Sequence, residues 1–492
     1  MMCVGMFMAV LDIQVVATSL PTIQVALDIG REQMSWIQTA YFTAEVIAIP
    51  MTGFFTRMLS MRGLFVIAVS LFTLASIGCG ESGSFGALII WRVVQGFSGG
   101  TLIPTVFSAV ILLFPASRQA LATMFAGVVA LLAPTLGPFV GGWITNAFSW
   151  HWLFFINVGP GMIAAMVAFF TLPKAPCRAQ EARTLDVSSV GLIAVALASL
   201  EVALKKGPAE GWMSIMVGGL LILSTVATYA FVRRTLAARH ALIDLRHFAD
   251  RNFAIGCVLS FILGVALFGS VYLMPVFLAF VRYHDALAIG SIMLVTGFAQ
   301  LLTAPLAVAV ENKCDTRLLS AAGFSALTIG LALSALQTPQ SDFDELYWPQ
   351  VIRGAAFMFC LLPPTRLALG RLRGEQVLDA SGLFNLMRNL GGAIGLALID
   401  TVVYSRTGAH ALAITERLRA GDIETARLVG IPIASFVAQK GEPANAMVEA
   451  VLRPYVEAAA MSHAINDAWM MVALLTASGL LALLFARRLP AV

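Results

Sequence analysis

Stretches of apolar residues long enough to cross a lipid bilayer recur along almost the whole of this 492-residue chain. A membrane-spanning helix needs about 20 mainly apolar residues, because lipid offers no partner for an unpaired backbone N–H or C=O group. Charged residues make up 12% of the chain, about half the proportion in a soluble protein. We therefore expect an all-α membrane protein without a soluble domain between its spans. The sequence predicts fourteen spans, at residues 3–24, 34–55, 63–80, 85–107, 119–142, 152–172, 187–204, 212–232, 253–279, 286–310, 318–336, 347–368, 381–404 and 464–486.

The distribution of lysine and arginine predicts how these spans are oriented, because positive residues accumulate in cytoplasmic loops. With a cytoplasmic N-terminus, the cytoplasmic turns and the C-terminal tail hold 18 of the 31 lysine and arginine residues. The short loops on the other side hold four, and the long segment 405–462 holds six but counts little in this rule. Both termini are therefore predicted to be cytoplasmic, and 405–462 is predicted to be a long external loop.

Cysteines and histidines show no pattern that would suggest chemistry. The six residues of each type are scattered, without the spacing of a metal site or of a disulfide framework. A membrane-embedded enzyme would need clustered His, Asp or Cys side chains, and a channel would need a filter-like loop. Neither is visible, so the sequence favours a transporter that uses no metal or cofactor and has no nucleic-acid partner.

Four ionisable side chains lie well within predicted spans. Charge is costly there, and a charged residue in such a position usually has a function. They are Asp12 in the first span, Glu45 in the second, Arg92 in the fourth and Arg388 in the thirteenth. Burial favours the neutral form of a carboxyl group, so a carboxylate that opens alternately to each side can carry protons. The same carboxylate also attracts lipophilic cations. Because the proton and the cation compete for one negative charge, their flows are coupled in opposite directions. A static ion pair is the alternative for each of the four charges.

Other charges lie closer to the ends of the predicted spans. Arg353, Asp400 and Asp467 are near the outer ends, where we expect interfacial or structural pairing. Glu201 lies near the end of the short predicted span 187–204 and is expected at the interface.

Helix-breaking residues are concentrated in APTLGPFVGG, within the fifth span. Proline in a helix interior removes a hydrogen bond, and glycines four apart let another backbone approach closely. A bend combined with a close contact would suit a pivot between two rocking halves, although ordinary tight packing is the alternative. The residues concerned are Pro134, Gly137, Pro138, Gly141 and Gly142.

A weak internal repeat indicates that the two halves of the chain are related. Residues 93–96 (VVQG) precede LIPT at 102–105, and residues 351–354 (VIRG) precede LLPPT at 361–365. Internal repeats are a feature of secondary transporters, which place the substrate at the repeat interface.

Several motifs, in order along the chain, resemble those of one transporter family. LDIQVVATSLP (11–21) carries Asp12, and WRVVQGFSGG (91–100) carries Arg92, Gln95 and Gly96. APTLGPFVGG resembles the fifth-span motif that marks antiporters. Further matches are WHWLFFINVGPG (150–161), LIDLRHFADRNF (242–253) and SGLFNLMRNLGGAIG (381–395). Together these motifs resemble the major facilitator superfamily and, within it, the 14-span drug:proton antiporters of the EmrB/QacA type.

The resemblance implies two six-helix bundles, at 1–175 and 251–492, with two extra helices and a linker at 176–250. It implies export of hydrophobic or amphipathic toxic compounds, driven by a proton gradient, across a bacterial inner membrane. The charges within the spans make Asp12, Glu45 and Arg92 the candidates for proton coupling, with Arg388, Arg353 and Asp400 as secondary candidates. Glu45 is chosen from this sequence alone, because it is not part of the superfamily motif. EmrB-like members also commonly work with a periplasmic adaptor protein and an outer-membrane channel.

The turn after the second span, GFFTRMLSMRG (53–63), departs from the family pattern. Gly53 and Arg57 fit the gating-loop motif of the superfamily, but its acidic residue and second glycine are absent. A dedicated transporter of a single metabolite is the alternative function. Such a protein would need more polar contacts than the few that are visible, such as Gln14, Gln38 and Asn385.

Overall fold

The computed structural model describes residues 1–175, 186–238, 243–311, 313–372, 375–431 and 446–487, in which every regular element is a helix. The elements are α1 (Met2–Ala26), α2 (Arg31–Gly80), α3 (Phe85–Leu113), α4 (Ala116–Ala147), α5 (Trp152–Phe155), α6 (Val158–Thr171), α7 (Val187–Glu210), α8 (Ile215–Ala237), the 3-10 helix η2 (Leu245–Ala249), α9 (Arg251–Phe280), α10 (Ala286–Glu311), α11 (Thr316–Ser334), α12 (Phe343–Leu369), α13 (Glu375–Arg419), α14 (Ile423–Val429) and α16 (Ala446–Leu484).

The helices confirm the predicted all-α membrane fold. Twelve described helices are long and apolar enough to cross a membrane, and α1 contributes a shorter apolar stretch, Met2–Ala17. The α2 helix contains both the second and the third predicted spans, and α5 and α6 together form the sixth. The seventh span is longer than predicted, because α7 continues to Glu210, so that Glu201 lies inside a helix rather than at its end.

Ser60 interrupts α2 with a non-helical backbone (φ 64°, ψ 159°). The two parts of α2 both pack against α3, since Tyr41 lies under the Arg92 side chain and Ser76 accepts a hydrogen bond from Gln95. The chain therefore reverses direction between Tyr41 and Ser76, within the segment where the sequence predicts a turn. The Ser60 hydroxyl closes this turn by accepting a hydrogen bond from the Gly63 N–H at 3.2 Å.

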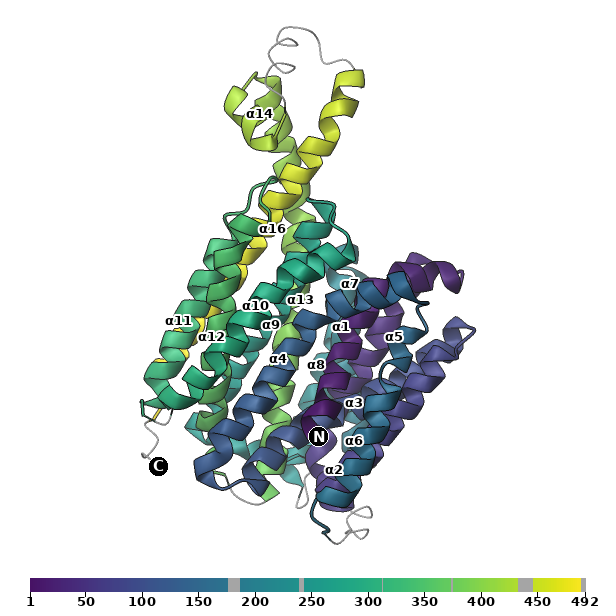
Figure 1. Ribbon diagram of the computed structural model, residues 1–492, viewed down its shortest axis with the longest axis vertical. Helices are drawn as coiled ribbons and strands as arrows, with labels where there is room; N and C mark the ends of the chain where they lie inside the picture. The colour runs from purple at the N-terminus through teal and green to yellow at the C-terminus, as the bar shows by residue number, and fades with distance from the viewer. Residues whose placement is uncertain (176–185, 239–242, 312, 373–374, 432–445, 488–492) are drawn as a thin grey trace.

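Two groups of helices lie side by side, with α1–α6 in one and α9–α16 in the other (Figure 1). They meet where α4 packs against α10 and where α2 packs against α13. The inserted helices α7 and α8 pack on each other, and α7 also contacts α2 and α13. The domain boundaries proposed from the sequence at 175 and 250 stay predictions, and residues 176–185 lie outside the described part of the chain.

A capping residue explains where the first of the two inserted helices begins. The Asp186 carboxylate accepts hydrogen bonds from the backbone N–H groups of Ser188 and Ser189, at the start of α7. Arg234 of α8 also donates two bonds to it, at 2.6 and 2.9 Å. The hydrogen bonds from Arg234 hold the pKa of the Asp186 carboxyl well below its usual range. This ion pair therefore ties the beginning of α7 to the end of α8.

The segment predicted as a long loop at 405–462 is largely helical where it is described. The α13 helix does not end near residue 404 but continues to Arg419, α14 follows, and α16 begins at Ala446. We call the described residues 405–431 and 446–462 the hairpin; it projects beyond the other helices in Figure 1. It is helical because it buries an apolar cluster of its own, consisting of Ile414, Leu418, Ala426, Val429, Ile431, Val456, Ala459 and Ala460.

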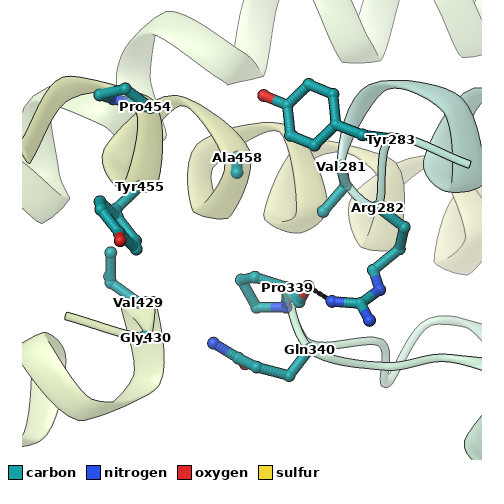
Figure 2. Close-up of a pocket in the computed structure, with 10 residues that line it drawn as sticks. All are labelled: Val281, Arg282, Tyr283, Pro339, Gln340, Val429, Gly430, Pro454, Tyr455 and Ala458. Atoms are coloured by element: carbon teal, nitrogen blue, oxygen red, sulfur yellow. Dashed lines mark hydrogen bonds between the residues drawn. The ribbon is translucent and has the colours of Figure 1, made fainter. Parts of the chain in front are cut away.

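The base of the hairpin borders a cavity of about 570 Å³. Figure 2 shows that this cavity lies between Tyr455 of α16, Gly430 at the end of α14, and Tyr283 and Gln340 in connections of the neighbouring helices. We call the end of the bundle that carries the hairpin the hairpin face. The opposite end, where α9 begins and α16 ends, is the terminal face.

Candidate functional site

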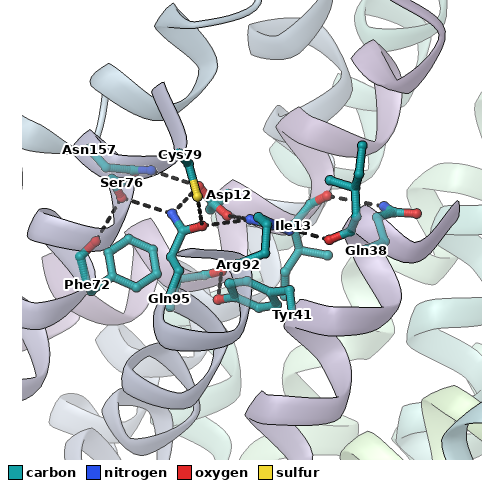
Figure 3. A network of polar contacts seen from close by, with 12 residues as sticks. Asp12, Ile13, Gln38, Tyr41, Phe72, Ser76, Cys79, Arg92, Gln95 and Asn157 are labelled. Carbon is teal, nitrogen blue, oxygen red and sulfur yellow. Dashed lines mark hydrogen bonds and ion pairs between the residues drawn. The ribbon is translucent and has the colours of Figure 1, made fainter. Parts of the chain in front are cut away.

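A buried polar network joins the first, second, third, fourth and sixth predicted spans (Figure 3). Arg92 Nη1 donates to Asp12 Oδ2 at 2.5 Å and to Gln95 Oε1 at 2.8 Å. Gln95 Nε2 and Asn157 Nδ2 donate to Asp12 Oδ1, at 2.9 and 2.8 Å. Asp12 is 1% exposed and Arg92 0%. The Asp12 carboxylate therefore has its charge neutralised and both of its oxygens hydrogen-bonded.

The surroundings of this network hold it in one arrangement. Arg92 Nε donates to the backbone oxygen of Ile37 at 3.1 Å, and its guanidinium carbon lies 4.4 Å from the centre of the Tyr41 ring. The Tyr41 hydroxyl donates to the backbone oxygen of Ala9 at 3.0 Å. All these partners come from the N-terminal half of the chain. The structure thus brings the predicted residues Asp12, Arg92 and Gln95 together within one half.

Glu45 lies apart from this network, one helical turn beyond Tyr41 on α2. It is 3% exposed, and no hydrogen bond or ion pair to it occurs among the described residues. Gly100 of α3 lies against its backbone. Arg388 of α13 is close enough to act on Glu45 electrostatically. Glu45 is therefore a buried carboxylate without a fixed partner, on the helix that packs against the other half.

Arg388 reaches across the contact between the halves. It is 6% exposed and donates a hydrogen bond to Asn385 on its own helix. Its guanidinium carbon lies 5.4 Å from the centre of the Phe107 ring of α3. Arg388 thus faces the N-terminal half without an ion-pair partner among the described carboxylates.

The glycine- and proline-rich stretch lies where α4 packs between α1 and α10. Pro134, Gly137, Pro138, Gly141 and Gly142 are all buried, and α4 remains one helix through them. The missing side chain of Gly137 leaves room for Gln14 of α1. On the other side, Gly290 of α10 lies directly against the backbone of Phe139. The stretch thus brings both halves close to one helix, and its role as a pivot stays a prediction.

Arg57 and Gly53 form a contact between the halves at the terminal face. Arg57 Nη1 lies 2.6 Å from Asp379 Oδ1 of α13, and the two side chains are 13% and 10% exposed. Gly53 lies directly against the backbone of Asp379, which leaves no room for a side chain. Ser381 adds a hydrogen bond to the backbone oxygen of Pro104 at 3.1 Å. Asp379 was not identified from the sequence, although it is an acidic residue at the start of a span on the arginine-rich side.

The secondary candidates Arg353 and Asp400 lie in the C-terminal half. Arg353 is 2% exposed, and its guanidinium carbon lies 4.6 Å from the centre of the Trp469 ring. Its Nε and Nη1 atoms have no hydrogen-bond acceptor among the described residues. Arg353 is therefore buried between helices and stacked on Trp469, and its expected place near the membrane interface stays a prediction. Asp400 accepts a hydrogen bond from the Tyr272 hydroxyl at 2.7 Å.

The weak sequence repeat corresponds to a repeated contact. Gly96 of α3 lies against the backbone of Tyr41 in α2, and Gly354 of α12 lies against the backbone of Thr296 in α10. The position of the buried arginine differs between the two copies of the repeat. Arg92 lies four residues before Gly96, whereas Arg353 lies directly before Gly354. The halves thus share a packing scheme but not a charge arrangement.

A side chain at position 96 is expected to prevent correct packing of α3 on α2. In Gly96→Val, the new Cβ would overlap the backbone of Tyr41, which cannot move without displacing the Arg92 site. We expect a loss of stability of about 1–3 kcal/mol or more and little folded protein by size-exclusion chromatography. Gly86→Val is the matched control, because open space surrounds Gly86 on the same helix. Equal yields from both variants would contradict this packing.

Comparisons with known proteins agree with this architecture. The model of the Major Facilitator Superfamily matches residues 2–396. The colistin resistance protein EmrB of Acinetobacter baumannii is 35% identical over 476 residues, covering 96% of this chain and 93% of the relative. The multidrug export protein EmrB of Escherichia coli K12 is 31% identical, covering 83% and 80%. The fatty acid resistance protein FarB of Neisseria gonorrhoeae is 28% identical, covering 84% and 82%.

Solved structures match the fold at low sequence identity. The human organic anion transporter MFSD10 superimposes with a TM-score of 0.59 at 13% identity, covering 96% of this chain and 97% of that one. The proton:xylose symporter XylE gives a TM-score of 0.56 at 13% identity, covering 96% and 93%. With a family match over most of its length and relatives above 30% identity, the chain belongs to the major facilitator superfamily and, within it, to the EmrB-type multidrug efflux permeases, so it is a membrane transporter rather than an enzyme.

Proposed function

We propose that this transporter is a proton-coupled antiporter that exports hydrophobic and amphipathic toxic compounds by alternating access. The observation that carries the proposal is the contrast between its two mid-span carboxylates. Asp12 is already paired with Arg92, whereas Glu45 is buried on α2, beside Arg388 of the other half, and has no hydrogen-bond or ion-pair partner in the described part of the chain. A carboxylate that is not committed to an ion pair can gain and lose a proton without dismantling a network.

In this mechanism Glu45 binds either a proton or the charge of a substrate at the contact between the halves. Proton binding neutralises the carboxylate and removes the cost of its burial, which favours rearrangement of the two halves. Loss of the proton on the other side restores the charge and prepares the site for the next substrate. Asp12 and Arg92 keep α1 and α3 in register during this cycle, and the energy comes from the proton gradient rather than from a cofactor.

The proposed location is the bacterial inner membrane, with the terminal face in the cytoplasm and the hairpin in the periplasm. The arginine-rich turns support this orientation, because Arg57, Arg246 and Arg317 belong to the connections of the terminal face.

A periplasmic adaptor protein, leading to an outer-membrane channel, is the proposed partner. The hairpin supports this proposal, since it extends beyond the bundle and presents apolar side chains such as Leu412 and Leu428, which are 69% and 60% exposed. Tyr455 at the cavity of Figure 2 adds to the same surface. Replacing both Leu412 and Leu428 with serine is expected to prevent co-purification with an adaptor while leaving transport in liposomes intact.

Proton coupling is tested with purified protein in liposomes that contain a pH-sensitive dye. We expect a lipophilic cation such as ethidium to trigger proton movement in the wild type, and Glu45→Gln to abolish it because glutamine cannot exchange a proton. Glu210→Gln is the control, since Glu210 forms an exposed pair with Lys206 at 2.8 Å. Unchanged proton movement in Glu45→Gln would assign coupling to another residue. No movement in the wild type with a broad panel of compounds would refute antiport.

A further inference from the structure

The inserted helix α7 carries two charged residues that the mechanism above does not use. Glu201 and Lys205 are one turn apart, so both lie on the same side of the helix. The Lys205 ammonium group donates a hydrogen bond to the Thr39 hydroxyl of α2, and Glu201 is partly buried. A helix that only filled space between the bundles would not need two charges on its inner side, because charge within a span is costly.

The hydrogen bond between Lys205 and Thr39 fixes the relative depth of the two helices. From Thr39, α2 continues for six residues to Glu45, a rise of about 9 Å toward the terminal face. From Lys205, the same direction along α7 leads four residues to Glu201, a rise of about 6 Å. The two carboxylates therefore lie at similar depths on neighbouring helices. The α2 and α7 helices are in contact, and Glu201 is close enough to Glu45 to act on it electrostatically.

Polar groups continue from Lys205 to the hairpin face. Lys205 interacts electrostatically with Asp400 of α13, which accepts the hydrogen bond from Tyr272 of α9. Trp212, just beyond α7, donates a hydrogen bond to the Thr401 hydroxyl at 3.0 Å and holds the end of α7 against α13. Polar side chains of α2, α7, α9 and α13 thus extend from the hairpin face to Lys205, one turn from Glu201.

We propose that Glu201 shares the transported proton with Glu45, so that the proton carrier is a pair of carboxylates and the inserted helix α7 is part of the coupling machinery. This inference rests on the proposed proton antiport. Two carboxylates close together in a medium of low dielectric constant repel each other, so one proton held between them is favoured over two charges. A proton from water at the hairpin face reaches the pair, and the same proton leaves to water at the terminal face. The ammonium group of Lys205 offsets the negative charge of the empty pair.

The inference is tested with Glu201→Gln in the liposome assay, measured over a range of pH. Without the repulsion from Glu201, Glu45 holds its proton less tightly, so the pH profile of substrate-driven proton movement is expected to shift by one unit or more to more acidic values. The rate at neutral pH is expected to fall about tenfold. Glu201→Asp, which keeps the charge, is expected to restore the wild-type profile. Substrate binding in detergent monitors folding and is expected to remain.

Glu210→Gln is the matched control on the same helix, because Glu210 is more exposed and already paired with Lys206. A Glu201→Gln variant with the wild-type rate and pH profile would overturn the inference while leaving the proposed antiport intact. A wild type that moves no protons would refute both. If Glu201→Gln does not fold, Lys205→Met serves as the second test. Without the positive charge of Lys205 the deprotonated pair lacks a counter-charge, so the pH profile of proton movement is expected to shift to more alkaline values. An unchanged pH profile in Lys205→Met would overturn the inference.

Discussion

Replacing Arg92 with methionine is expected to abolish transport and to destabilise the folded protein by about 3–5 kcal/mol. The substitution leaves the Asp12 carboxylate buried, with the amides of Gln95 and Asn157 as its remaining partners and no positive charge beside it. It also removes the hydrogen bond to Ile37 and the stacking on Tyr41, so α1 and α2 lose the side chain of α3 that contacts both of them. Thermal unfolding in detergent, followed by intrinsic fluorescence, measures the loss of stability.

A double substitution separates the cost of an unpaired charge from the value of the pair. In Asp12→Asn combined with Arg92→Met neither charge of the pair remains, and we expect more than half of the lost stability to return, because neutral replacements of a buried pair are often tolerated. Transport is expected to stay absent, since the register of α1 and α3 depends on the network. The exposed pair Lys206–Glu210 supplies the control, where Lys206→Met is expected to cost no more than about 1 kcal/mol. If Arg92→Met were as stable as this control, the ion pair would not be structurally important.

The membrane-spanning helices could be predicted from the sequence because lipid imposes a simple condition on length and composition. All fourteen predicted spans correspond to helices, and the largest errors lie where that condition does not apply. The apolar stretch of the thirteenth span ends near residue 404, so its length and composition predict no helix in the hairpin. The helices of the hairpin depend instead on contacts between α13, α14 and α16. The reversal at Ser60 lies in a predicted turn, but nothing in the local sequence indicates a left-handed serine.

The sequence predicts which residues belong to the candidate site but not which of them pair with each other. Asp12, Arg92, Gln95 and Glu45 could be selected one by one, because polar residues within spans are conspicuous. The sequence could not show that Arg92 is committed to Asp12, 80 residues away, while Glu45 has no such partner. The same limit explains why Asp379 was missed as the partner of Arg57, since the two are 322 residues apart. Which charges meet is decided by tertiary packing.

Breaking the contact between Arg57 and Asp379 is expected to open the terminal face. This ion pair joins α2 of one half to α13 of the other, and its side chains are mostly buried. A charged hydrogen bond of this kind contributes about 2 kcal/mol, enough to shift an equilibrium between two conformations by more than tenfold. Arg57→Ala should therefore favour the conformation in which the halves separate at this face, and slow transport by impeding the return to the closed form.

The opening is measured with a reporter cysteine, Thr365→Cys, in a protein whose six native cysteines have been replaced. Thr365 is 4% exposed on α12, beside a small cavity that Phe107 of α3 also lines. Labelling by a thiol reagent is expected to rise at least tenfold in Arg57→Ala. The charge exchange Arg57→Asp with Asp379→Arg is expected to restore slow labelling, because it re-forms the ion pair in the opposite sense. Arg317→Ala is the control, since Arg317 pairs with Asp315 within its own half. Rapid labelling that persists in the exchanged protein would show that the shape of the arginine, rather than the ion pair, keeps this face closed.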